Sequence, residues 1–172
     1  LRAGEFEVER RMMICASCGD MPVQTALNDI VLYRPNDELH LVKLHVNVGG
    51  ADMGRIMSDG LIIATPTGST AYSLSAGGPV VDPLLDCMLL TPICPHSPLS
   101  RPAVLPYWEK IEIVTSPEGR GLMLSADSRT PIAIKPGARI EVQRSKLRAG
   151  FIRFGHSSFY DAFRVKISEW SN

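Results

Sequence analysis

One stretch, residues 59–79, constrains the fold of this chain more than any other part of its sequence. Its apolar run at residues 61–64 is short enough for a single buried strand. Thr65-Pro66 ends that strand, because proline cannot extend a hydrogen-bonded ladder. Small, mostly hydroxyl-bearing residues follow at 67–70, and residues 71–75 have helical character up to a Gly-Gly-Pro stop. The stretch therefore predicts a strand, a polar turn and a short helix.

A strand that feeds a polar turn and a helix start leaves backbone N–H groups free to bind an anion or a polar ligand. Asp59 and Tyr72 stand on either side of this turn. The same spacing also fits a tight corner whose hydroxyls only face solvent. The residues of this stretch alone leave both interpretations open.

Composition narrows the class of protein. The 172 residues include 18 basic and 18 acidic side chains, so the formal net charge is zero, and no basic block indicates nucleic-acid binding. No apolar run reaches the length of a membrane span. The chain starts at Leu1 without a recognisable leader, from which we expect a piece whose N-terminal portion is missing.

The four cysteines are too sparse for a disulfide scaffold and favour reduced thiols in a cytoplasmic protein. Cys15 and Cys18 form a C-x-x-C pair, a spacing used in zinc and redox sites. Zinc needs two further ligands at comparable spacing, and Cys87 and Cys94 do not supply it. We therefore expect no metal site.

Most of the remaining chain is predicted to form short strands. The clearest is at 39–48, where Val42, Leu44 and Val46 alternate with polar residues. Strands are also expected around residues 6–14, 30–32, 88–93, 110–115, 121–125, 132–134 and 139–144. The proline-rich residues 92–106 should form an ordered but irregular crossing. This spacing of strands and Gly/Pro turns indicates an antiparallel β assembly.

The C-terminal end differs, because residues 158–170 carry a helical pattern. Phe159, Phe163, Ile167 and Trp170 would share one face, and Ser157 or Ser158 can cap the start. Such a stripe is usually core packing, and we expect it to dock on the sheet or on a partner domain.

Four motifs together resemble NAD kinases. Residues 59–79 are similar to the signature of that family along their whole length. The A-L-N-D string at 26–29, the T-P-I-C-P-H string at 91–96 with Arg101-Pro102, and the S-A-D-S string at 125–128 resemble three further family motifs in the same order. This combination is far more specific than a lone glycine pattern.

The resemblance implies a two-domain enzyme of which this chain, residues 1–172, is the C-terminal, NAD-binding part. The implied fold is mostly β, an antiparallel sandwich-like domain with a short helix after T-P-T-G-S-T and a C-terminal helix. The catalytic base is expected in a G-G-D-G loop of an N-terminal α/β domain. Gly49-Gly50-Ala51-Asp52 is the nearest string here, and its hairpin context gives Asp52 no catalytic role.

Site residues follow from the same resemblance. It implies NAD contacts by Asn28 and Asp29, by Asp59, and by an adenine-lining segment made of Thr70, Ala71, Tyr72, Ser73, Leu74 and Ser75. Arg129 is an open case: its guanidinium would meet a phosphate of NAD or ATP, or would face solvent. His96 is read as structural. A polar β-turn at 28–29 and a half-buried surface tyrosine at 72 are the plainer alternatives.

The function that the resemblance implies is transfer of the γ-phosphoryl group of ATP, with Mg²⁺, to the 2′-hydroxyl of the adenosine ribose of NAD. The expected partners are NAD, ATP and further copies of the chain, without nucleic acid or membrane. The fragment alone should be inactive. Two rivals are a related lipid kinase domain and a non-catalytic dinucleotide-binding or interaction module.

Overall fold

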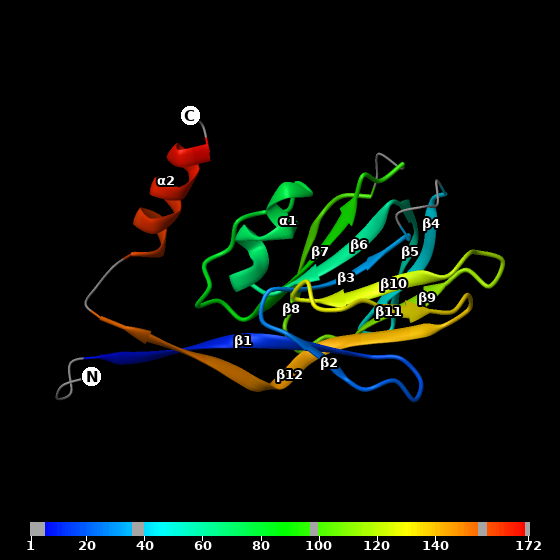
Figure 1. Cartoon of the computed structure of the whole chain (residues 1–172), viewed down its shortest axis with the longest axis horizontal. Helices are drawn as coiled ribbons and strands as arrows, with labels where there is room; N and C mark the ends of the chain where they lie inside the picture. Colours follow the sequence, from blue (N-terminus) through cyan, green and yellow to red (C-terminus); the bar gives the residue numbers. More distant parts are fainter. Residues whose placement is uncertain (1–5, 36–39, 97–99, 155–157, 171–172) are drawn as a thin grey trace.

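The structure is a computed structural model that describes residues 6–35, 40–96, 100–154 and 158–170, without the side chains of 162, 166, 167, 169 and 170. Over these residues the chain forms two six-stranded antiparallel sheets (Figure 1). The first sheet has the order β2 (Gln24–Ala26), β1 (Glu7–Ser17), β12 (Arg139–Arg153), β9 (Ile111–Thr115), β4 (Val42–Val48), β5 (Ala51–Ser58). The second has the order β11 (Ile132–Ile134), β10 (Leu122–Ala126), β3 (Asp29–Tyr33), β6 (Gly60–Ala64), β7 (Cys87–Ile93), β8 (Ala103–Pro106). The predicted mostly-β, sandwich-like fold is confirmed.

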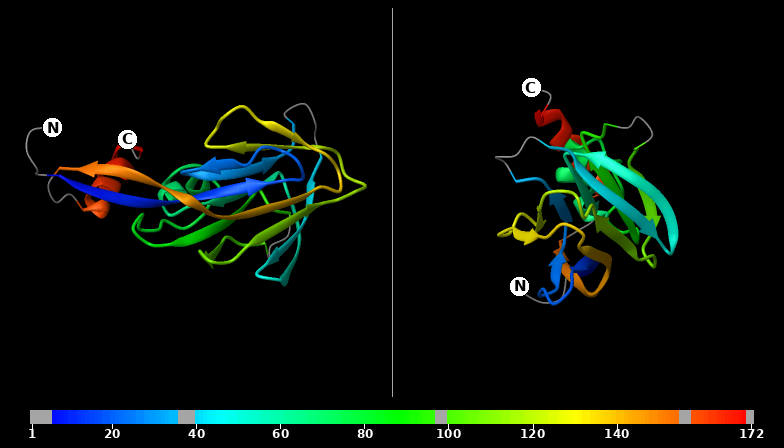
Figure 2. Two further views of the ribbon diagram at one scale, coloured as in Figure 1. Left: turned by 90° about the horizontal axis from the view of Figure 1, so that it is seen from below. Right: turned by 90° about the vertical axis from the view of Figure 1, so that its right-hand side faces the viewer.

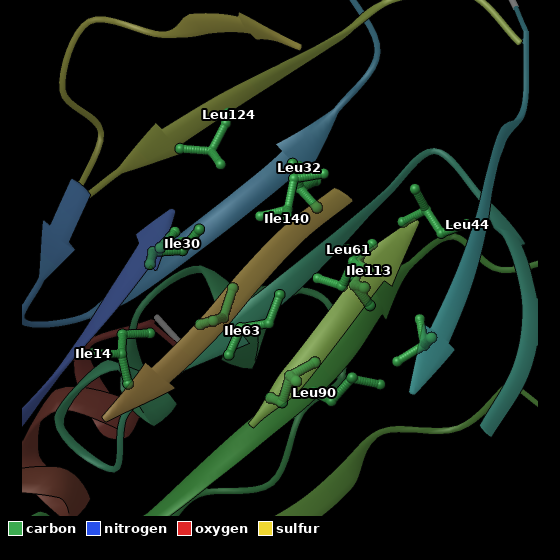
Figure 3. Close-up of a cluster of buried hydrophobic side chains, with 14 of the residues drawn as sticks. Ile14, Ile30, Leu32, Leu44, Leu61, Ile63, Leu90, Ile113, Leu124 and Ile140 are labelled. Atoms are coloured by element: carbon green, nitrogen blue, oxygen red, sulfur yellow. The ribbon is translucent and has the colours of Figure 1, made fainter. Parts of the chain in front are cut away.

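The two sheets face each other across one hydrophobic core. Figure 3 shows Ile14 and Ile140 of the first sheet in one cluster with Ile30, Leu61 and Ile63 of the second, and all five side chains are fully buried. Because side chains alternate between the faces of a strand, each strand contributes every second residue to this core. The alternation of β4 places Val42, Leu44 and Val46 there, as the sequence predicted.

β6 departs from alternation, because all five of its residues are buried. Ile63 faces the sandwich core, whereas Ile62 and Ala64 belong to a second cluster with Val31 and Leu89 on the outer face of the sheet. The segment that follows β6 covers that outer face. A strand covered on both faces needs a continuous apolar run, which explains the sequence at residues 61–64.

β1 and β12 form a long ribbon that extends beyond the sandwich (Figures 1 and 2). Their pairing runs from Glu7 opposite Arg153 to Ser17 opposite Glu141, with a register shift between Met12 and Ile14. Polar contacts hold the outer half, where Glu9 accepts hydrogen bonds from Arg11 at 2.5 Å and from Arg153 at 3.2 Å. The sequence had placed the last strand at 139–144 only, because the outer half lacks the alternation of a half-buried strand.

The C-terminal helix, α2 (Phe159–Trp170), is confirmed. Ser158 caps it, since its Oγ accepts a hydrogen bond from the backbone N–H of Tyr160 at 3.2 Å. The rings of Phe159 and Phe163 stack with centroids 5.9 Å apart. Ser157 and the side chains of Ile167 and Trp170 lie outside the described residues. Figure 1 shows α2 set apart from both sheets and from the ribbon.

The strand expected at 88–93 is confirmed as β7, so the irregular crossing expected at residues 92–106 begins later, and β8 occupies its end. Pro92 lies within β7, and residues 103–106 form β8. β8 pairs only with residues 87–90, so β7 is an edge strand at Pro92, where the missing N–H is tolerated. The sequence also failed to predict β5. Its Met53 and Met57 are apolar but exposed, so the strand lacks the alternation of apolar and polar residues that marks a half-buried strand.

We predict that Ile63→Ala destabilises the fold by about 2–5 kcal/mol, because it empties a fully enclosed position in the core. Urea denaturation followed by circular dichroism measures this change. Ile152→Ala makes the same truncation on the ribbon, where Ile152 is 46% exposed, and should change stability by less than about 0.5 kcal/mol. Equal effects of the two substitutions would contradict the assignment of the core.

Candidate functional site

A cavity of about 890 Å³ opens on the outer face of the second sheet. It brings together four residues that the sequence singled out, namely Asp29, Asp59, Tyr72 and Arg129, from positions up to 100 residues apart. The remaining walls come from β3, the end of β7 and the turn after β10: Val31, Tyr33, Arg34, Pro35, Ile93, Cys94, Ser125, Ser128, Thr130 and Pro131. The four motifs of the sequence therefore meet around one concavity.

The corner after β6 is built as predicted from a turn and a short helix. A 3₁₀ turn, η1 (Thr67–Thr70), precedes α1 (Tyr72–Ser75). Thr65 fixes the corner, because its Oγ1 accepts from the N–H of Gly68 at 3.1 Å and donates to the carbonyl of Leu27 at 2.5 Å. Gly68 packs so closely that a Cβ there would lie 2.0 Å from the carbonyl oxygen of Asn28. Only glycine fits this approach, which ties the corner to the 27–29 segment.

The hydroxyl-bearing residues of the corner serve its packing. Ser73 is buried and its Oγ lies 2.9 Å from Thr91 Oγ1, and Ser69 Oγ donates to the carbonyl of Val81. Thr70, Ala71, Leu74 and Ser75 do not line the cavity, and neither does Asn28, which contributes its backbone to the neighbouring turn. Of the predicted adenine-lining segment, Tyr72 alone reaches the cavity wall.

Asp29 is the most unusual group in the cavity wall. The residue is 5% exposed, and no described residue donates a hydrogen bond to its carboxylate. Burial, together with the negative charge of Asp127, raises the pKa of Asp29 from 3.8 to about 6. A carboxylate that is desolvated and lacks a donor is suited to accept a hydrogen bond from a bound ligand.

Asp59 and Arg34 form the opposite side of the cavity. Arg34 Nη2 lies 3.3 Å from Asp59 Oδ1, and both side chains are about one-third exposed or less. The backbone of Asp59 is fixed by its N–H, which donates to Ile93 at 2.9 Å. Arg34 was not predicted from the sequence, since no helical or strand periodicity and no motif marks it.

Arg129 uses much of its guanidinium on the backbone. Its Nε donates to Ala126 at 3.0 Å, and its Nη2 donates to the carbonyl of Thr25. These bonds hold the turn after β10 against β2, while the residue still lines the cavity. The sequence offered phosphate contact or solvation as the role of Arg129. The structure adds a third role, because its side chain braces the cavity wall through backbone hydrogen bonds.

Tyr72 and Cys94 make the rim of the cavity. Tyr72 is 47% exposed, and its pKa is raised by burial and by the nearby groups Cys94, Asp59 and Asp29. Cys94 has a positive φ of 44°, a turn geometry that the T-P-I-C-P-H string does not announce. The backbone N–H of His96 donates to Met57 at 2.9 Å, so its main chain has a structural contact.

The remaining candidates lie elsewhere. Gly49-Gly50-Ala51-Asp52 forms the β4–β5 hairpin, as the sequence indicated, and Asp52 Oδ1 accepts from the N–H of Gly54 at 2.6 Å. Cys15 and Cys18 lie in β1 and the turn after it, and no disulfide joins any of the four cysteines. Over the described residues no cluster of three or more His, Cys, Asp or Glu side chains suits a metal. No described helix is long and apolar enough to cross a membrane.

Comparison with known families decides the identity of this domain. The family model for the ATP-NAD kinase C-terminal domain matches residues 27–154, which include every residue of the cavity wall, the whole second sheet and all of the first sheet except β1 and β2. The chain belongs to the ATP-NAD kinase family. The cavity residues Asp29, Asp59 and Tyr72 all lie within the matched region of this chain.

Curated NAD kinases resemble the chain over nearly its whole length. The chain is 39% identical over 176 residues to the NAD kinase of Desulforamulus reducens, covering 100% of this chain and 61% of the relative. It is 41% identical over 170 residues to that of Symbiobacterium thermophilum, covering 96% and 60%. The chain thus spans about 60% of the length of these NAD kinases.

Solved NAD kinase structures share the fold. Yeast NADH kinase, complexed with NADH, superposes with a TM-score of 0.76 at 36% identity, covering 87% of this chain and 45% of the yeast chain. The NAD kinase from Archaeoglobus fulgidus, in complex with ATP, gives 0.74 at 34% identity, covering 86% and 56%.

We predict that Asp29→Asn stabilises the fold at neutral pH. Because the folded-state pKa of Asp29 lies above its ordinary value, the folded chain binds this proton more tightly, and stability falls as pH rises from about 4 to about 6. The amide cannot ionise, so the variant should be more stable at pH 7.5 by on the order of 1–3 kcal/mol.

The advantage of Asp29→Asn should vanish below about pH 4, where Asp29 is protonated in both states. Urea denaturation at pH 3.5, 5.5 and 7.5 follows it. Asp20→Asn, in an exposed turn, is the matched control for the same substitution at a carboxylate that is not buried. A variant that is equally or less stable at pH 7.5 would contradict the burial of an ionised Asp29.

Proposed function

We propose that this chain is the NAD-binding part of an ATP-dependent NAD kinase. The observation that carries this proposal is the cavity in which Asp29 of one motif converges with Asp59 and Tyr72 of another. Membership of the ATP-NAD kinase family and the similarity to kinases complexed with NADH and with ATP support it. All the relatives compared are NAD or NADH kinases, so a lipid kinase domain is not favoured.

Each cavity residue has a role in the proposed complex. The unpartnered carboxylate of Asp29 accepts hydrogen bonds from hydroxyl or amide donors of the dinucleotide. Tyr72 offers an aromatic face to the adenine at the rim. Asp59 accepts from a second donor group across the cavity, and Arg34 holds its carboxylate in place through their contact at 3.3 Å.

The other predicted residues act around this centre. Asn28 shares the turn with Asp29 and offers an amide that both donates and accepts. Ser73, Leu74 and Ser75 belong with Tyr72 to the short helix α1, and Ser73 is anchored to Thr91. Thr70 ends η1, and Ala71 joins η1 to α1. Arg129 braces the wall and has further N–H donors for a ligand oxygen.

In the full enzyme, the proposed reaction moves the γ-phosphoryl group of ATP to the 2′-hydroxyl of the adenosine ribose. This chain supplies binding and orientation of NAD. A G-G-D-G domain outside the chain supplies the base and the phosphate cradle, and Mg²⁺ arrives with ATP and neutralises phosphate charge. We further propose a cytoplasmic homo-oligomer in which a second copy covers the exposed rim at Tyr72.

We predict that Tyr72→Ala weakens NAD binding by roughly 1–3 kcal/mol, the range for stacking of a base on an aromatic ring. Isothermal titration calorimetry with NAD measures it. Tyr160→Ala is the control, because Tyr160 lies on α2, is 63% exposed and does not line the cavity. Unchanged affinity in Tyr72→Ala would remove Tyr72 from the site, and no binding by the unmodified chain would remove NAD as its ligand.

We also predict that the chain alone produces no useful NADP, because positioning without a base and a phosphate clamp gives little rate. A coupled NADP assay on the chain alone, and on the chain joined to the G-G-D-G domain of a relative, should show turnover only for the joined protein. Robust turnover by the chain alone would place the base within these 172 residues. An inactive joined protein that still binds NAD would favour a non-catalytic binding module.

A further inference from the structure

Asp127 occupies a strained turn beside the cavity. It follows the last residue of β10 with φ at 48°, and Ser128 comes next with φ at 56°. Two consecutive left-handed residues without glycine are costly and persist only where surrounding contacts hold them. Here Ser125 Oγ donates to the carbonyl of Arg129 at 2.9 Å, and the N–H of Arg129 donates to Ala126 at 3.1 Å.

The carboxylate of Asp127 is fully engaged by backbone donors on another segment. Its Oδ2 accepts from the N–H of Leu27 at 2.7 Å, and its Oδ1 accepts from Asn28 at 2.7 Å and from Asp29 at 3.2 Å. The N–H of Asp127 donates in return to the carbonyl of Asp29 at 3.0 Å. Three successive N–H groups form a concave anion site, and the anion that fills it is a side chain of the same chain.

The segment that Asp127 holds, residues 27–29, is also bonded to the corner after β6 that carries Tyr72. The carbonyl of Leu27 accepts from Thr65 Oγ1 at 2.5 Å, and the carbonyl of Asn28 accepts from the Thr65 N–H at 2.8 Å. Thr65 starts the corner that leads to Tyr72, and Gly68 packs against Asn28. A continuous set of hydrogen bonds thus runs from Asp127 through residues 27–29 to the corner that carries Tyr72.

We propose that Asp127 is a positioning residue for dinucleotide binding, which locks residues 27–29 so that the open carboxylate of Asp29 faces the cavity. The two carboxylates have different tasks because their surroundings differ. Asp127 accepts three internal hydrogen bonds and has little capacity left for a ligand, whereas Asp29 accepts none from the described residues. This inference rests on the proposed function only in naming NAD as the ligand.

The protonation of Asp29 depends on the charge of Asp127. The charge of Asp127 opposes ionisation of Asp29 and so contributes to its raised pKa, after the larger effect of burial. The other charged or titratable groups that line the cavity with Asp29 are Tyr33, Arg34, Asp59, Tyr72, Cys94 and Arg129. A substitution at Asp127 alters none of these, so a change in the titration of Asp29 reports on Asp127.

The test is Asp127→Asn, because asparagine tolerates positive φ but carries no charge and only one acceptor oxygen. We expect the pKa of Asp29, followed by the ¹³C resonance of its carboxyl carbon, to fall by about one unit when the neighbouring charge is removed. The Kd for NAD at pH 7.5 should rise about tenfold, as the loss of one charge-assisted hydrogen bond would give. Asp82→Asn is the control, since Asp82 Oδ1 accepts from the N–H of Leu84 in a distant turn.

An Asp127→Asn variant that folds but leaves both the pKa of Asp29 and the NAD affinity unchanged would overturn the proposal. A role in stability alone would lower the melting temperature without moving the Asp29 titration, and that outcome also counts against it. Should the variant not fold, amide hydrogen exchange in the unmodified chain decides. The N–H groups of Leu27, Asn28 and Asp29 must then be protected, and rapid exchange would refute the proposed lock.

The same design separates this inference from the proposed function. If the unmodified chain fails to bind NAD, the proposed function fails. The titration of Asp29 and the exchange of the three amides still show whether Asp127 holds the 27–29 segment, because neither measurement needs the ligand.

Discussion

The architecture of the site depends on the burial of β6 from both sides. The inner face of that strand is covered by the other sheet, but its outer face, with Ile62 and Ala64, needs a cover from elsewhere. The segment after β6 provides it by turning back through η1 and α1. Because that cover stops short of β3 and β10, the uncovered part of the same face becomes the cavity. Tyr72 stands at the boundary because it sits on the covering segment itself.

Close backbone approach gives this corner its rigidity. A Cβ on Gly68 would meet the backbone of Asn28, and one on Gly78 would lie 2.3 Å from Ser73 Oγ. Both glycines belong to the stretch that also supplies the buried strand. Close packing against Asn28 and against Ser73 therefore sets the requirement for glycine at these two positions. The hydroxyl of Ser69 accepts from the N–H of Val81, and that of Ser73 pairs with Thr91, so these buried polar groups have partners where water is excluded.

Local patterning accounts for the elements that could be predicted from the sequence. The alternation of β4, the apolar run of β6 and the helical period of α2 each reflect burial along one element, so each is visible in the residues themselves. The outer half of β12 could not be predicted, because it contacts a neighbouring strand and solvent rather than a core. Strand β5 could not be predicted because Ile56 is its only hydrophobic residue in the core. Of the cavity, Asp29, Asp59, Tyr72 and Arg129 were predicted from motif resemblance. Arg34 lies outside every motif, and Cys94 lies in a motif that gave it no role at the site. The engagement of Asp127 by amides about 100 residues away is likewise beyond any local pattern.

The pairing of β1 with β12 has a consequence for the order of events in folding. Glu7 lies opposite Arg153, so the first strand of the described chain forms its longest pairing with the last strand, β12. β3 similarly waits for β10, although it pairs locally with β6 as well. Contacts of such sequence separation carry a large loop-closure cost and slow the search for the native topology. During synthesis on the ribosome, β1 can therefore pair early only with the short strand β2, at residues 14–16, and its long edge toward β12 stays open until almost the whole domain has emerged.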